Sequence, residues 1–98
     1  MAEVPPYARR VLEWCRRRVT PHVDGIRWVR VSGDRVAAYP RVEAGRNVIE
    51  LHVGDRAPEW KVEKGVIHEC LHFRWGDGRI EGGIYGETER LHREYKSM

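Results

Sequence analysis

Val66-Ile67-His68-Glu69-Cys70-Leu71-His72-Phe73 is the stretch around which the rest of this 98-residue chain is organised. It contains the pattern H-E-x-x-H. On a helix, side chains four residues apart lie on one face, so His68 and His72 would present two imidazoles to one metal ion. Glu69 would lie beside them, placed to act on a water rather than on the metal. We therefore predict that this stretch is helical and holds a metal site.

Helical periodicity supports this prediction. At 100° per residue, His68 and His72 share an arc that avoids the apolar stripe of the helix, and Glu69 lies between the two arcs. The stripe consists of Val62, Val66, Ile67, Cys70 and Leu71, with Phe73 beside Val62. Two polar residues outside a stripe can simply face water, but the spacing of the motif favours a metal site.

The composition predicts one small globular domain, residues 1–98. A chain of this size buries roughly 60–65% of its unfolded surface, so its core is thin. Charged residues make up 34% and hydrophobic residues 41%, a balance typical of folded soluble proteins. Residues 1–10 lack the apolar segment of a signal peptide, and no apolar run has membrane length. We therefore expect a cytoplasmic protein.

The net charge of +3 includes one basic run, Arg16-Arg17-Arg18. We interpret this run as the solvated face of a helix in preference to a nucleic-acid contact. Cys15 and Cys70 both fall on apolar helical arcs, which predicts buried free thiols that could meet in the core. A reducing compartment disfavours a disulfide, and neither cysteine has the C-x-x-C spacing of a metal site.

Three helices are predicted. The first begins at Pro5-Pro6, because proline suits the first helical position, and it runs for three to four turns. The motif helix extends from about residue 59 to residue 75 and is stopped by Gly76-Asp77-Gly78. We expect the glycine-rich residues 82–86 to form a loop, followed by a last helix that ends near Tyr95.

About three strands are predicted between the first two helices. Residues 26–31 and 35–39 are rich in β-branched and aromatic side chains and are expected to form a hairpin that Pro40 ends. Residues 48–53 alternate between apolar and other side chains, which predicts a half-buried strand. His52 is expected to point away from the core, toward solvent rather than toward the cleft.

A catalytic zinc usually has three protein ligands and a water, so a third ligand is expected outside the motif helix. The inward stripe of the last helix consists of Ile84, Thr88, Leu91 and Tyr95. Glu87 borders this stripe on one side and His92 on the other, whereas Glu89 falls well off it. Because Glu87 is also close to the loop that returns from the motif helix, we prefer Glu87. His92 and Glu89 stay as alternatives.

The motif and the order of elements resemble the zincin metallopeptidases of the gluzincin type, in the size range of the single-domain minigluzincins. The order is also similar to that of SprT-like and ImmA-like proteases. The resemblance rests on His68-Glu69-Cys70-Leu71-His72 and on Gly86-Glu87-Thr88-Glu89. In many gluzincins the first glutamate of an E-x-E stretch binds the metal, which again selects Glu87. An acidic residue often follows four positions later, where this chain has Leu91.

This resemblance implies a fold and an activity. The fold is zincin-like, with an N-terminal backing helix, a small sheet of about three strands, the HExxH helix and a C-terminal glutamate helix. The activity is zinc-dependent hydrolysis of peptide bonds. One zinc ion is held by His68, His72 and Glu87, and Glu69 is the general base toward a metal-activated water. Tyr85 and Tyr95 are candidates, by residue type, for stabilising the oxyanion.

The expected partner is a peptide or protein substrate in extended conformation along an edge strand, for which we predict residues 48–53. The chain is too short for the second subdomain of larger zincins. A shallow cleft with restricted peptide binding, self-association or a latent enzyme is therefore expected. The alternative is a non-catalytic or latent metal-stabilised module that binds a protein or nucleic-acid partner through the Arg-rich first helix. In a third interpretation the motif is coincidental in an ordinary α+β domain.

Overall fold

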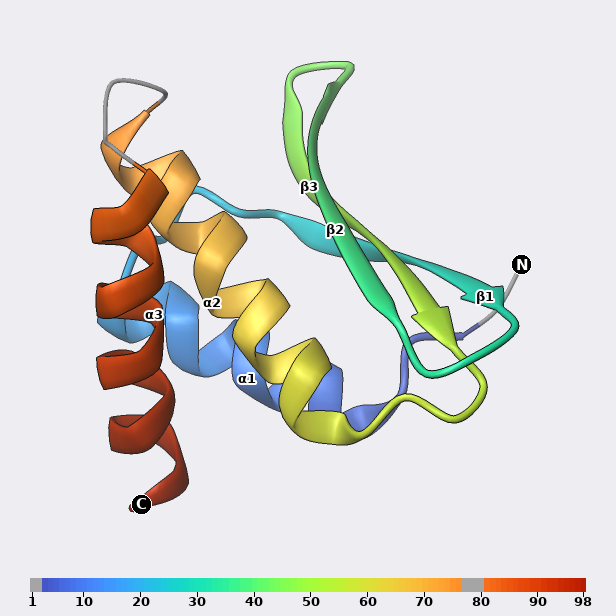
Figure 1. Ribbon diagram of the computed structural model, residues 1–98. Helices are drawn as coiled ribbons and strands as arrows, with labels where there is room; N and C mark the ends of the chain where they lie inside the picture. Colours follow the sequence, from blue (N-terminus) through green and yellow to red (C-terminus); the bar gives the residue numbers. More distant parts are fainter. Residues whose placement is uncertain (1–2, 77–80) are drawn as a thin grey trace.

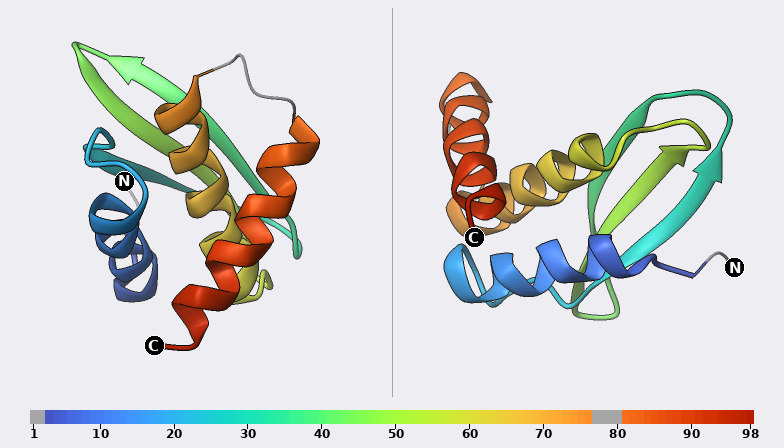
Figure 2. Two further views of the ribbon diagram at one scale, coloured as in Figure 1. Left: turned by 90° about the vertical axis from the view of Figure 1, so that its left-hand side faces the viewer. Right: turned by 90° about the horizontal axis from the view of Figure 1, so that it is seen from below.

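The computed structural model describes residues 3–76 and 81–98, which form an α+β fold (Figure 1). The elements along the chain are α1 (Pro6–Arg18), β1 (Gly25–Val31), β2 (Val36–Glu43), β3 (Arg46–Gly54), α2 (Glu59–Trp75) and α3 (Glu81–Lys96). Helix α2 lies across one face of the sheet, and α1 and α3 both pack against α2 (Figure 2). The predicted class and order of elements are confirmed.

The three strands form a mixed sheet in the order β1-β3-β2. Strand β3 pairs antiparallel with β2 across a two-residue turn, Ala44-Gly45, whose φ angles of 49° and 77° belong to a tight hairpin. On its other side β3 pairs parallel with β1. The hairpin predicted between residues 26–31 and 35–39 is therefore wrong, because these strands lie at opposite edges of the sheet.

The connection from β1 to β2 crosses the end of β3 instead of turning back on itself. Backbone hydrogen bonds hold this crossing: Asp55 N–H donates to Val31 C=O at 3.0 Å, and Arg56 N–H donates to Gly33 C=O at 2.8 Å. Gly54 allows the close approach, since a Cβ at this position would lie 2.2 Å from the Gly33 oxygen. The short Ser-Gly-Asp turn that suggested a hairpin is thus a crossover.

Strand β2 continues through Pro40 to Glu43, so the prediction that Pro40 ends the strand is wrong. Gly54 N–H donates to Arg35 C=O at 2.8 Å, and antiparallel pairs of this kind recur at every second residue. The even-numbered residues of β2 therefore direct their backbone groups away from β3. Pro40 is one of them, and its missing N–H removes no bond from the sheet.

Strand β3 shows the alternation predicted for residues 48–53. Ile49, Leu51 and Val53 are buried, whereas His52 is half-buried on the opposite face, away from the core as predicted. The prediction that this segment is an edge strand is wrong, because β3 has a neighbour on each side. A strand paired on both sides has no unpaired ladder of backbone groups for a peptide.

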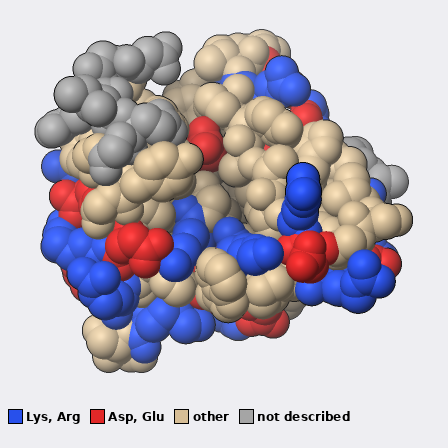
Figure 3. Space-filling view, viewed as in Figure 1, with Lys and Arg blue, Asp and Glu red and all other residues tan. Residues whose placement is uncertain are grey.

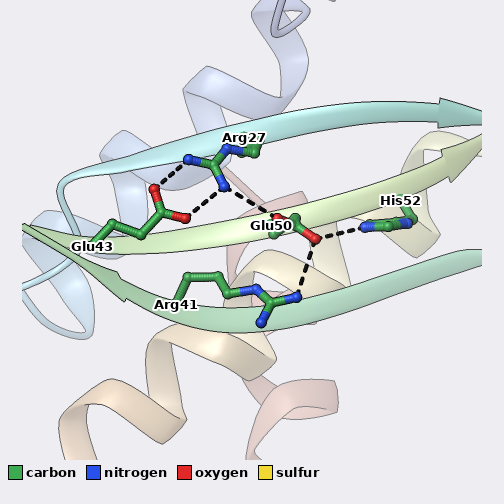
Figure 4. A network of polar contacts seen from close by, with 5 residues as sticks. All are labelled: Arg27, Arg41, Glu43, Glu50 and His52. Atoms are coloured by element: carbon green, nitrogen blue, oxygen red, sulfur yellow. Dashed lines mark hydrogen bonds and ion pairs between the residues drawn. The ribbon is translucent and has the colours of Figure 1, made fainter.

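The face of the sheet that is turned away from the helices carries a polar network (Figure 4). Glu50 on β3 is its centre: its Oε2 lies 2.7 Å from His52 Nε2 and 3.4 Å from Arg41 Nη2 on β2. Its Oε1 accepts from Arg27 Nη1 on β1 at 3.3 Å, and Arg27 also pairs with Glu43. The hydrogen bond with His52 is the main cause that lowers the pKa of Glu50. The network links all three strands.

The helix predictions are met for α1 and α2. Pro6 occupies the first turn of α1, and α2 has the predicted bounds. Gly76 ends α2 with a φ of 72°, and its N–H donates to His72 C=O at 2.7 Å. Asp77 and Gly78, the rest of the predicted stop signal, lie outside the described residues.

Helix α3 begins at Glu81, so the loop predicted for residues 82–86 is wrong. Glycine costs a helix interior about 1 kcal/mol relative to alanine. That cost is offset where one face of the helix packs, and here Ile84 and Leu91 are 0% and 2% exposed and Thr88 is 4% exposed. This is the inward stripe expected from the sequence.

Helix α2 supplies much of the core. Val62, Val66, Ile67, Cys70 and Leu71 are all fully buried. Cys15 of α1 and Cys70 are buried free thiols, as predicted, and a hydrogen bond between them together with burial raises the pKa of Cys15. Helix α2 lies close to the sheet at Gly65, where a Cβ would make an ordinary contact of 3.6 Å with Ala38 Cβ. No helix in the described part of the chain is long and apolar enough to span a bilayer.

Candidate metal centre

Helix α2 brings three residues of the H-E-x-x-H motif together. Ligand atoms of His68, Glu69 and His72 all lie within 4.8 Å of one another. The two Nε2 atoms are 3.2 Å apart, and the imidazole rings meet edge to face with centroids 4.8 Å apart. The arrangement follows from the helix itself, because residues four apart are separated by about one turn. The predicted convergence of these side chains is confirmed.

This geometry fits a zinc ion. Zinc binds imidazole nitrogen at about 2.0–2.1 Å, so two nitrogens of a tetrahedral site are about 3.4 Å apart. The separation of 3.2 Å between the Nε2 atoms of His68 and His72 is close to that value. Imidazole nitrogen is also a donor that zinc commonly binds. The group is therefore suited to hold a metal ion.

The group lies in a cleft of about 620 Å³ between β2, α2 and α3. Val36, Ala38 and Pro40 of the edge strand form one wall, and α3 forms another. Glu69 is 6% exposed, whereas His68 and His72 are half-buried. In the view of Figure 3, the surface is hollowed between the helices on one side and the sheet on the other. The two histidines are therefore accessible from the side of β2.

Among the described residues of helix α3, Thr88 and Tyr85 contact His68. Thr88 Oγ1 lies 3.5 Å from His68 Nδ1, the ring nitrogen that is not directed at His72. The Tyr85 ring is 4.9 Å from the ring of His68, measured between centroids, and is 60% exposed at the cleft. Tyr95, the second tyrosine considered from the sequence, packs against Trp14 of α1 instead, with ring centroids 5.3 Å apart.

The residues considered as a third ligand lie in three different settings. Glu87 is not part of the group of His68, Glu69 and His72, and its carboxylate pairs with Arg90 on the same helix. Its role as a ligand stays a prediction. Glu89 lines the cleft and pairs with Lys64 of α2 at 2.8 Å, and this contact is the main cause that lowers its pKa.

His92, the remaining alternative, is committed to a buried pair. Its Nε2 lies 2.8 Å from Glu63 Oε1, and Lys96 Nζ lies 3.3 Å from the other oxygen of that carboxylate. Sequence reasoning missed this pair. The available signal was Glu63 itself, which falls within the apolar arc of α2 and therefore requires a buried partner.

The comparisons with known proteins assign no family. No family model matches the sequence, and neither a curated protein nor a solved structure matches the chain.

Proposed function

We propose that the protein is a zinc-dependent peptidase of the gluzincin type. The observation that supports this most is the meeting of His68 Nε2 and His72 Nε2 at 3.2 Å, with Glu69 in the same group. The group opens into a cleft beside an edge strand, where an extended peptide has room to lie.

Glu69 is the proposed general base. When bound, zinc supplies Lewis-acid chemistry, which acidifies a water molecule and polarises a carbonyl group. The Glu69 carboxylate is nearly buried, so it lies at the floor of the cleft and has little contact with solvent. It takes a proton from the attacking water and returns that proton to the leaving amine.

A carboxylate of α3 is the proposed third ligand. Glu87 is preferred from the sequence, but Glu87 and Glu89 are about 200° apart around the helix, so they cannot face the same side. The cleft is lined by Glu89 and by Tyr85, which precedes it by one turn. We therefore favour Glu89, which would exchange Lys64 for the metal. His92 is disfavoured because Glu63 occupies its Nε2.

The proposed substrate lies along β2. Val36 and Ala38 each direct an N–H and a C=O away from β3, and both residues line the cleft. An extended peptide can pair with these groups as an added strand. Pro40 has no N–H to offer, so pairing would weaken at this position. Tyr85, exposed at the cleft, is the candidate for stabilising the oxyanion.

The test compares wild type with Glu69→Gln after both have been loaded with zinc. The variant should bind zinc but lose about 100- to 10,000-fold of its cleavage rate on an unstructured protein, because it has no base. Glu13→Gln is the matched control, since Glu13 is an exposed α1 residue that pairs with Arg16. Equal cleavage by wild type and Glu69→Gln would disprove the peptidase proposal.

A second candidate is a metal-stabilised module that binds an acidic partner. A groove of about 980 Å³ runs beside α1 and is lined by Arg9, Arg10, Arg16 and Arg17. Glu3, Glu13 and Asp24 line the same groove, so the four arginines leave a small excess of positive charge, which favours a partner of negative charge. The two candidates differ in one measurement: the module would bind zinc and show no cleavage that depends on Glu69.

A further inference from the structure

Thr88 contacts the ring nitrogen of His68 that faces away from the proposed metal site. Its Oγ1 lies 3.5 Å from His68 Nδ1 and 2.7 Å from the carbonyl oxygen of Ile84, one turn earlier in α3. The hydroxyl therefore bridges the backbone of one helix and an imidazole of the other.

The hydrogen-bonding capacity of a hydroxyl decides the direction of these two contacts. A threonine hydroxyl has one proton and two lone pairs, and a carbonyl oxygen can only accept. The proton of Thr88 is therefore donated to Ile84, which leaves Oγ1 as an acceptor toward His68. His68 Nδ1 must then carry the donated proton, and in a neutral imidazole Nε2 keeps its lone pair. Nε2 is the atom that lies 3.2 Å from His72.

The hydroxyl is held in place by the packing around it. Thr88 is 4% exposed, and its neighbours on the inward stripe, Ile84 and Leu91, are 0% and 2% exposed. One turn further along α3, the buried pair of Glu63 and His92 ties the two helices together. The acceptor is thus part of the core rather than a mobile surface group.

We infer that Thr88 is a positioning residue: it holds His68 as the Nδ1–H tautomer, with Nε2 directed at the metal site. The inference rests on the proposed metal site, because only a metal gives this tautomer a function. The contacts of Thr88 with Ile84 and His68 do not depend on that proposal. Partners of this kind orient metal-binding histidines, and their removal typically weakens metal affinity by about 10- to 100-fold. Here a buried hydroxyl on α3 has that role, so the packing of α3 affects how strongly the site binds a metal ion.

The experiment has two readouts. ¹⁵N NMR of the metal-free protein, at a pH where imidazoles are neutral, reports the tautomer of His68. A competition titration with a zinc chelator reports zinc affinity. Thr88→Val should reduce the Nδ1–H population of His68 and weaken zinc binding by about 10- to 100-fold. Thr88→Ser, which keeps the hydroxyl, should restore both. Thr20→Val is the matched control, because Thr20 is also buried but accepts from His22 N–H.

Each outcome decides the inference. If Thr88→Val leaves both the tautomer and the zinc affinity unchanged, the inference is wrong, and the proposed function is untouched. If wild type binds no zinc, the proposed function fails, while the tautomer shift still tests the role of Thr88. Thr88→Ala is a second variant that favours the helix, and it should give the same tautomer shift if Thr88→Val folds poorly.

Discussion

Histidines occur in two settings along the interface between α2 and α3. At one end, His92 meets the Glu63 carboxylate at 2.8 Å, and the side chains are 11% and 4% exposed. At the other end, two imidazoles meet Nε2 to Nε2 at the floor of a cleft. An acid and a base that face each other satisfy each other and hold the fold together. Two bases that converge define a position that a cation can bridge.

The largest effect is expected when one of the two converging imidazoles is removed. His72→Ala should weaken zinc affinity by roughly 100- to 1,000-fold, because a zinc binding free energy of about 10–16 kcal/mol is shared among four ligands. His92→Ala, at the other end of the same interface, should leave zinc affinity nearly unchanged. A chelator competition titration measures both. Comparable losses in the two variants would mean that the two ends are not functionally distinct.

The next largest effect is expected when the buried pair of Glu63 and His92 is broken. Glu63→Ala leaves His92 and Lys96 without their shared carboxylate, and removing one partner of a buried pair costs about 3–5 kcal/mol. We place this change at the lower end of the range, because Lys96 is largely exposed. Chemical denaturation gives the free energy of unfolding. A loss below about 1 kcal/mol would show that the pair is incidental to stability.

A third experiment sharpens the comparison by locating the carboxylate that completes the site. Glu89→Ala should weaken zinc binding by about 10- to 100-fold, whereas Glu87→Ala should change it little. The two residues are on the same helix and both are ion-paired, so each is the control for the other. The reverse result would restore Glu87, the residue preferred from the sequence.

The smallest effect concerns a histidine outside this interface, His52, and its partner Glu50. The folded state lowers the pKa of Glu50, chiefly through His52, so the network adds stability above the pKa of the unfolded state, about 4.3. This contribution is lost as the pH falls through the folded pKa. Glu50→Gln should therefore lower Tm modestly near pH 7, and this difference should shrink as the pH falls below the pKa of the unfolded state. A Tm difference that does not depend on pH would contradict this assignment.

The parts of the structure that could be predicted are those with local causes. Helix α2 was predicted correctly because its apolar stripe and its Gly76 stop signal are contained in one segment. The convergence of His68 and His72 follows from their spacing on that helix. The buried face of β3 likewise follows from its own alternation.

The parts that failed depend on distant segments. β1 and β2 looked like a hairpin because β3, which separates them, comes later in the chain. Pro40 fits within a strand only where that strand is an edge, which the sequence of β2 does not reveal. Similarly, the side of α3 that faces the cleft depends on how α3 lies against α2. The choice between Glu87, which borders the stripe, and Glu89, which falls off it, could therefore not be settled from periodicity alone.

Gly65 lies where the core meets the cleft, and its lack of a Cβ affects both. It lines the cleft, and a Cβ there would make ordinary contacts of 3.6–3.8 Å with Ala38, Leu51 and Val36. Alanine would therefore fit, and it should stabilise α2 by up to about 1 kcal/mol. The same atom would make the passage beside β2 shallower for a bound chain. At this position, a substitution that stabilises α2 would therefore also reduce the space for a ligand in the cleft.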